Sequence, residues 1–159
     1  MAVTLDLSAI PEVDHVADGV CISGYRATQY ANELWQAGIR HVLKLYDDIP
    51  FFPRHFTVLN NYIEDGEPLT KDKLQRGVAF ITEQVNAERP VLVMCAYGIS
   101  RSSTFVLAYL LTRGHTLRQA YDLLKQRHPQ ANPHPLLWKS LIEHYQLTDR
   151  LEDVAKWGR

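Results

Sequence analysis

Short apolar runs alternate with segments of helical period along this chain, and the alternation limits its possible folds more than any other feature. Apolar and β-branched runs, each bounded by Gly, Pro, Asp or Asn, predict strands at 20–22, 41–45, 58–63 and 91–94. Periodicity and end signals predict helices at 28–37, 70–87, 101–113, 116–128 and 135–145. Such alternation indicates the α/β class, here a single mixed, mostly parallel sheet flanked by helices.

The size and charge of the chain exclude some classes of fold and function. A chain of 159 residues with 46% apolar residues can bury a core without disulfides, so we expect a single domain over residues 1–159. The 17 Lys and Arg nearly balance the 18 Asp and Glu, which argues against binding of nucleic acid or an anionic membrane through overall charge. The longest apolar runs have seven residues, far below the roughly 20 of a membrane helix. The sequence carries no signal for an oligomeric state.

The N-terminal segment and the cysteines bear on location and cofactors. No basic stretch precedes an apolar one near the N-terminus, so we expect no signal peptide and a cytoplasmic location. The two cysteines, Cys21 and Cys95, lack the spacing of a metal site or a disulfide framework. The seven histidines form no two-histidine zinc motif, and we interpret them as surface or core residues. We therefore expect neither a metal nor a cofactor.

The segment after the fourth predicted strand is the strongest candidate for a site. Cys95 ends that strand, and Arg101 opens the following helix six positions later. Ligands of parallel sheets bind beyond the carboxyl ends of the strands, and backbone N–H groups at a helix N-terminus form a cradle for an anion. Arg101 can hold two oxygens of a phosphate, and the same positive field favours a Cys95 thiolate. Alternatively, Cys95 is a small buried apolar residue, which is common for free cysteine.

These residues resemble the Cys-x5-Arg signature of the protein tyrosine phosphatase superfamily, and the chain from about 17 to 146 resembles a dual-specificity protein phosphatase. The resemblance extends over segments 38–42, 91–94, 102–104, 108–111, 120–121 and 127–129. It implies hydrolysis of phosphotyrosine, phosphoserine and phosphothreonine through a phosphocysteine on Cys95, with Ser102 assisting departure of the thiolate. It also implies that the phosphate, from a phosphoprotein or a small aryl phosphate, is bound by the loop Ala96, Tyr97, Gly98, Ile99, Ser100 and Arg101.

Such a reaction needs a proton for the leaving group, and a carboxylic acid is the expected source. Asp65 follows a predicted strand 30 positions before Cys95, where the dual-specificity family places its acid. Glu64 and Glu67 are alternatives in the same segment. Asp65 is followed by Gly66, and Asp-Gly is also an ordinary turn signal, a role that is compatible with acid catalysis.

One residue departs from the family pattern. Met94 stands where the family usually has His before the cysteine, and a thioether cannot replace the hydrogen bonds of an imidazole. We expect reduced or shifted activity rather than none. Alternatively, Met94 is simply a core residue of its strand.

Several residues have weaker claims to function. The aromatic and basic segment 51–56 would rim the pocket or pack as a surface loop, and Tyr97 would face the substrate or point outward. Cys21 would form a disulfide with Cys95 under oxidation or remain a quiet strand residue. The loop contains no Lys, which disfavours phosphoinositides. The tail after Tyr145 is expected to be a solvated short helix without chemistry.

Two other functions remain open from the sequence. The loop could bind a phosphorylated partner without turnover, as a catalytically silent pseudophosphatase, if Met94 leaves the nucleophile ineffective. It could also serve sulfur or arsenic redox chemistry, which needs the cysteine but no acid at the position of Asp65.

Overall fold

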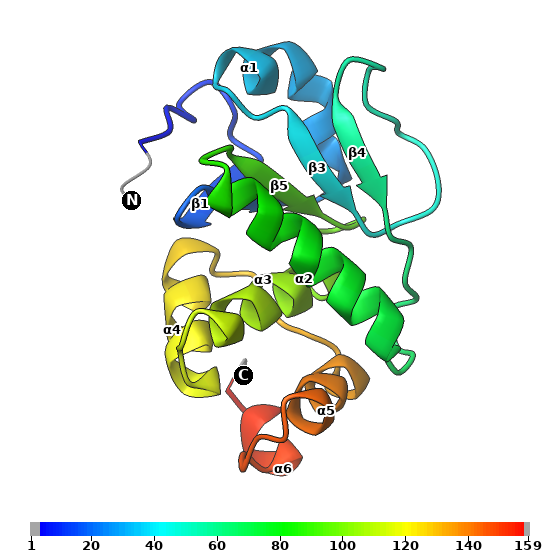
Figure 1. Cartoon of the computed structure of the whole chain (residues 1–159), viewed down its shortest axis with the longest axis vertical. Coiled ribbons are helices and arrows are strands. Elements are labelled where there is room, and N and C mark those ends of the chain that lie inside the picture. Colours follow the sequence, from blue (N-terminus) through cyan, green and yellow to red (C-terminus); the bar gives the residue numbers. More distant parts are fainter. Residues whose placement is uncertain (1–3, 158–159) are drawn as a thin grey trace.

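The computed structural model describes residues 4–157, which contain a five-stranded sheet in the order β1-β2-β5-β3-β4 (Figure 1). The strands are β1 (Val13–Ala17), β2 (Val20–Ser23), β3 (His41–Lys44), β4 (Thr57–Asn60) and β5 (Val91–Met94). Strands β2, β5, β3 and β4 run parallel, whereas β1 pairs antiparallel with β2 at one edge. The predicted mixed, mostly parallel sheet is confirmed.

Helices cover both faces of this sheet. The 3-10 helix η1 (Tyr25–Tyr30) and α1 (Ala31–Gln36) pack on one face. The opposite face carries α2 (Lys71–Asn86), α3 (Arg101–Thr112), α4 (Leu117–Arg127), α5 (Pro135–His144) and α6 (Leu151–Val154), and Figure 1 shows this larger group below the sheet. No helix within residues 4–157 is long and apolar enough to cross a membrane.

Strand β5 divides its side chains between the two cores. Successive strand side chains point to opposite faces of a sheet. Val91, Val93 and Cys95 therefore join the core under α2 to α6, while Leu92 and Met94 join the core under η1 and α1. All five are buried. The site at the end of β5 is consequently supported from both sides of the sheet.

Local signals place the helices close to the predicted ranges. Thr70 caps α2 by accepting a hydrogen bond from the Lys73 N–H, and Thr116 forms a capping box with Gln119 at the start of α4. Helix α3 is buried from Ser102 to Leu110 and lies at the centre of its layer, in contact with α2, α4 and α5. Its N-terminus is thereby fixed directly after β5.

Three elements before α2 differ from the sequence predictions. Strand β1 was not predicted, because Asp14 and His15 interrupt its apolar pattern at a sheet edge. The helix expected at 28–37 begins as the 3-10 turn η1. The strand expected at 58–63 is regular only as far as Asn60, although the N–H groups of Asn61 and Ile63 still donate to carbonyls of the chain at the end of β3.

The short helix expected in the tail is present as α6, but the expectation that the tail is solvated was wrong. Val154 of α6 is fully buried, and the Trp157 ring packs against those of Tyr121 and Trp138 at centroid distances of 5.8 and 5.9 Å. Charged residues dominate the tail sequence, so its two apolar anchors gave too weak a periodic signal. The tail is part of the core under α4 and α5.

Candidate active site

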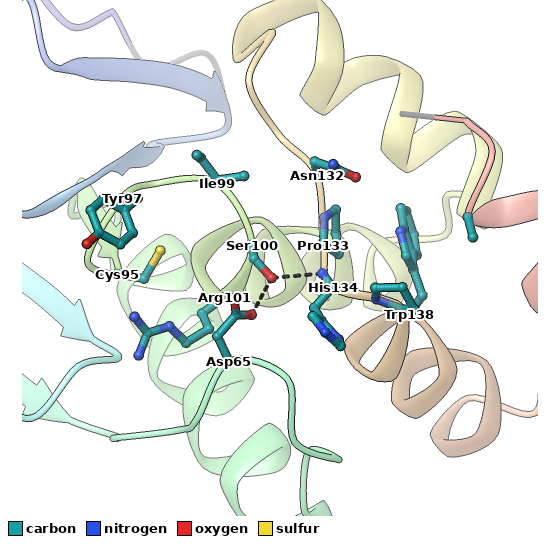
Figure 2. Close-up of a pocket in the computed structure, with 12 residues that line it drawn as sticks. Asp65, Cys95, Tyr97, Ile99, Ser100, Arg101, Asn132, Pro133, His134 and Trp138 are labelled. Atoms are coloured by element: carbon teal, nitrogen blue, oxygen red, sulfur yellow. Dashed lines mark hydrogen bonds between the residues drawn. The ribbon is translucent and has the colours of Figure 1, made fainter. Parts of the chain in front are cut away.

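A cleft of about 360 Å³ opens beyond the carboxyl end of β5 (Figure 2). Its lining includes Asp65, Cys95, Tyr97, Ser100 and Arg101, so the structure brings the predicted acid, nucleophile and arginine to one place. Asp65 comes from the loop between β4 and α2, and Arg101 is the first residue of α3. The others belong to the loop that joins β5 to α3. We call residues 95–101 the anion loop.

Three carbonyls of the anion loop accept hydrogen bonds from other segments of the chain. The Ala96 carbonyl accepts a hydrogen bond from the Tyr25 N–H at 2.9 Å, and the Ile99 carbonyl accepts one from the Asn132 N–H at 2.9 Å. The Gly98 carbonyl accepts a third from the His128 Nε2. In a trans peptide the following N–H points the opposite way, so the N–H groups of residues 97 and 99 point away from Tyr25 and His128, neither of which lines the cleft. This is the geometry of an anion-binding nest.

Two glycines let the anion loop pack closely on β2. Gly98 has φ +70°, and a Cβ there would lie 2.7 Å from the Gly24 nitrogen. A Cβ on Gly24 would in turn lie 2.9 Å from the Tyr97 carbonyl carbon. Both neighbours are backbone atoms and cannot rotate aside. The curvature of the loop therefore depends on glycine at both positions.

The segment after α4 supports the anion loop and also lines the cleft with Asn132, Pro133 and His134. His128 donates to Gly98, Asn132 donates to Ile99, and the His134 N–H donates to the Ser100 Oγ at 2.8 Å. We call residues 128–134 the brace segment. Its contacts follow consecutive positions of the loop, so it holds the loop in register.

Cys95 and Ser102 meet at the start of α3. The Cys95 Sγ is 3.2 Å from the Ser102 Oγ, and both residues are buried. The thiol lies at the positive end of the α3 dipole, which favours a negative charge there. A hydroxyl at this distance can donate a hydrogen bond to a sulfur anion.

Arg101 is held by the chain that leads to Asp65. Its Nη1 donates to the Ile63 carbonyl at 3.0 Å, two residues before the predicted acid. A guanidinium has five N–H donors, so the others are free to bind oxygens of an anion in the cleft. This contact also ties the loop of Asp65 to α3.

The three candidate acids are placed differently. The Asp65 Oδ1 accepts a hydrogen bond from the Ser100 Oγ at 2.6 Å, and Figure 2 shows this contact continuing to His134. The second oxygen of Asp65 therefore stays available at the cleft. Glu64 accepts from the Tyr62 hydroxyl, and neither Glu64 nor Glu67 lines the cleft.

Met94 occupies a buried position beside an unsatisfied hydroxyl. In the sheet it is aligned with Ser23 on β2 and with Lys44 on β3, so the three side chains share one face. The Ser23 Oγ is buried without a hydrogen-bond partner in the part of the chain that the structure describes. An imidazole at position 94 would supply such a partner, whereas the thioether supplies none.

Cys21 cannot pair with Cys95 in this fold. Cys21 is aligned with Leu92, three residues before Cys95, and it belongs to the core on the opposite face of the sheet. Burial raises the pKa of the Cys21 thiol to about 12. It is therefore a buried strand residue that takes no part in the chemistry, which is the second of the two interpretations of Cys21 from the sequence.

The aromatic segment 51–56 packs next to the sheet rather than in the cleft. Phe56 is buried against the rings of Trp35 and Phe52, and no residue of the segment lines the cleft. Phe51 is exposed and lies over the buried Lys44 ammonium at 4.1 Å. Tyr97, in contrast, is 77% exposed and stands at the cleft rim.

Sequence reasoning missed the supporting residues of this site. Asp14, His128 and His134 each bond to the anion loop or to a residue that does, but they lie 30 to 114 positions from their partners. The only local signal was the Arg127-His128-Pro129 segment, whose proline marked a helix end. Within residues 4–157, no group of three or more His, Cys, Asp and Glu could hold a metal ion.

A cysteine and an arginine that flank an anion-binding loop, between a parallel strand and a helix, define the protein tyrosine phosphatase superfamily as the class. Comparison with known proteins gives the family. Residues 22–147 match the model of the dual specificity phosphatase catalytic domain, and the chain belongs to this family.

Individual relatives agree with this assignment. The chain is 32% identical over 147 residues to MAP kinase phosphatase with leucine-rich repeats protein 3 of Dictyostelium discoideum, a match that covers 87% of this chain and 16% of the relative. It is 34% identical to mouse dual specificity protein phosphatase 12, covering 73% of this chain and 36% of the relative. The chain thus spans well under half the length of either relative.

A solved structure supports the same fold. The crystal structure of a mouse putative dual specificity phosphatase complexed with zinc tungstate superimposes with a TM-score of 0.79 and 28% sequence identity. The alignment covers 91% of this chain and 93% of the mouse chain.

Proposed function

We propose that this protein is an active protein phosphatase that hydrolyses phosphotyrosine, and also phosphoserine and phosphothreonine, through a phosphocysteine on Cys95. The observation that carries the proposal is the placement of Cys95, Arg101 and Asp65 in one cleft whose loop N–H groups face inward. Its substrates are phosphorylated proteins, and an aryl phosphate serves as a small substitute in assays.

In the first step the Cys95 thiolate attacks phosphorus from the side opposite the leaving oxygen, and the phosphorus–oxygen ester bond breaks. The Arg101 guanidinium and the inward N–H groups bind the three non-bridging oxygens, where charge is spread in the transition state. Asp65 gives its proton to the leaving oxygen. The products of this step are the free alcohol or phenol and the phosphocysteine.

In the second step water attacks the phosphocysteine, and the sulfur–phosphorus bond breaks. The Asp65 carboxylate, now deprotonated, accepts a proton from this water. The Ser102 hydroxyl, 3.2 Å from the sulfur, donates to the departing thiolate. The balance over both steps is phosphate ester plus water to alcohol plus phosphate.

The exposed apolar rim favours an aryl substrate. Tyr97 and Ile99 are two of the exposed large apolar residues, and both line the cleft. A phosphorylated tyrosine can lay its ring along such side chains while the phosphate reaches the loop.

A catalytically silent phosphate reader is the second candidate function. Met94 beside the unsatisfied Ser23 hydroxyl favours it, because the network that a histidine would form is missing. Redox chemistry has less support, since it needs no acid and Asp65 lies in the cleft.

The first experiment is the pH dependence of aryl phosphate hydrolysis in the presence of a metal chelator. We expect a bell-shaped profile for the parent protein and no turnover for Cys95→Ser. Asp65→Asn should lower the rate about 100-fold for phenyl phosphate, whose leaving group needs the proton. Glu64→Gln is the matched control and should keep the parent rate.

The outcomes separate the candidate functions. Tungstate binding without turnover in the parent would establish the silent reader instead. Turnover that survives Cys95→Ser would refute the cysteine mechanism, and an Asp65→Asn rate equal to that of Glu64→Gln would remove Asp65 as the acid.

A further inference from the structure

His128 is a buried histidine with both ring nitrogens engaged, and the chemistry of the family motif does not account for it. It follows the last residue of α4 and is 1% exposed. Its Nε2 contacts the Gly98 carbonyl, and its Nδ1 lies 2.6 Å from the Asp14 Oδ2. The ring therefore connects β1 to the anion loop through the end of α4.

The two contacts define where the protons are. A carbonyl oxygen can only accept, so the Nε2 must carry the hydrogen that it donates to Gly98. The other nitrogen faces a carboxylate, which also only accepts, so the Nδ1 must carry a hydrogen that it donates to the Asp14 Oδ2. Donation from both nitrogens fixes the orientation of the ring. Asp14 is 38% exposed at its side chain, so it connects this buried ring to the surface.

The acceptor of the bond from His128, the Gly98 carbonyl, belongs to the peptide whose orientation places the Ile99 N–H. Gly98 is buried, has φ +70° and packs against the backbone of Ser23 and Gly24. A carbonyl released from His128 could turn toward the cleft, and the Ile99 N–H would then turn away from it. The cleft would lose a donor and gain a negative dipole at the place where an anion binds.

We propose that His128, oriented by Asp14, is a positioning residue that locks the Gly98 peptide with its carbonyl outward, so that the Ile99 N–H stays available for phosphate. The proposal rests on the proposed function, because it takes phosphate as the ligand of the cleft. It adds residues of β1 and of the brace segment to the catalytic apparatus, at positions remote from the Cys-x5-Arg motif.

Two amide substitutions separate the contacts of the ring. His128→Gln carries its amide nitrogen where Nε2 lies and can still donate to Gly98. His128→Asn carries its amide nitrogen where Nδ1 lies and can reach only Asp14. Both variants remove the imidazole, so a merely structural role predicts similar losses in the two. His115→Gln is the matched control, since His115 is half-buried in the turn between α3 and α4 and lines no part of the cleft.

The test measures tungstate affinity by calorimetry and hydrogen exchange of the peptide that contains residues 95–101. We expect His128→Gln to bind tungstate within about threefold of the parent and His128→Asn to bind about tenfold more weakly, which corresponds to one charge-assisted hydrogen bond. The loop peptide should exchange faster only in His128→Asn. In kinetic assays, kcat/KM should follow the same order.

The readouts distinguish two kinds of failure. If the parent binds no tungstate and hydrolyses no aryl phosphate, the proposed function fails, and loop exchange in the two variants still decides the role of His128. Equal affinity and equal loop exchange in His128→Gln and His128→Asn would overturn the positioning role, even if both variants are less stable than the parent.

Discussion

Gly98→Ala tests whether the close packing of the anion loop on β2 is needed for the chemistry. Gly98 has φ +70°, a conformation that costs a residue with a Cβ about 1–2 kcal/mol. Its Cβ would also lie 2.7 Å from the Gly24 nitrogen, whereas ordinary contacts begin at 3.4 Å. The obstructing atom is backbone, so the loop must move by several tenths of an ångström.

A movement of this size should reduce activity more than stability. A displacement of about 1 Å in a catalytic group can cost roughly 100-fold in rate. We therefore expect kcat/KM for an aryl phosphate to fall by about 10- to 100-fold. The free energy of unfolding in urea should fall by about 1–2 kcal/mol, which reflects the strained backbone.

Two further glycines separate backbone strain from steric contact. Gly114 has φ +97° with no atom within 4 Å of the position of an added Cβ. Gly114→Ala should therefore lower the free energy of unfolding by a similar amount and keep the activity of the parent protein. Gly24 has φ −92°, which any residue adopts, but its Cβ would meet the anion loop at 2.9 Å. Gly24→Ala should therefore lower activity through steric contact alone. If both Gly98→Ala and Gly24→Ala keep the activity of the parent protein, the close packing of the anion loop on β2 is not needed for the chemistry.

Three other predictions concern the buried Met94 and the half-buried Trp157, His15 and His41. Met94→His should raise kcat by about fivefold, the equivalent of one hydrogen bond of about 1 kcal/mol to the Ser23 hydroxyl, and a kcat and a thiol titration equal to the parent's would contradict this. Trp157→Ala should lower the free energy of unfolding in urea by about 2 kcal/mol, because it empties a ring site in the aromatic cluster, and an unchanged midpoint would show that the tail does not stabilise the core. The pKa values of His15 and His41 are both lowered, chiefly by burial, so the unfolded chain binds more protons and stability should fall as pH drops below about 6.5. Changing both to Gln should flatten this slope in urea titrations, and an unchanged slope would count against it.

The parts of the fold that could be predicted are those whose signals are local. Val91 to Met94 is a continuous apolar run because both faces of β5 are covered, and this run is recognisable without knowing what covers it. Thr70 and Thr116 mark their helices through hydrogen bonds to residues three positions away. Cys95 and Arg101 are likewise connected by one short loop. In each case the partner lies within a single turn or loop.

The parts that could not be predicted depend on contacts between distant segments. Strand β1 has an exposed edge, so its polar residues hide the alternation that would mark a strand. His128 meets Asp14 across 114 positions and Gly98 across 30, and no spacing in the sequence encodes either contact. Trp157 similarly finds its partners on α4 and α5. A period of two or 3.6 residues says which face is buried but not against what.

The Cys-x5-Arg motif forms an anion-binding site only when other segments of the fold orient the backbone of the anion loop. Its shape is fixed by bonds from Tyr25, His128 and Asn132 to three carbonyls, and these donors come from η1, the end of α4 and the brace segment. A peptide with the sequence of the loop has no such donors, so its carbonyls are free to turn inward and cancel the positive field of the N–H groups. The seven residues of the loop supply the nucleophile and the charge, but the orientation of their backbone is a property of the whole fold. Loss of anion binding should therefore accompany any change that detaches β1, η1 or the brace segment, even when Cys95 and Arg101 are intact.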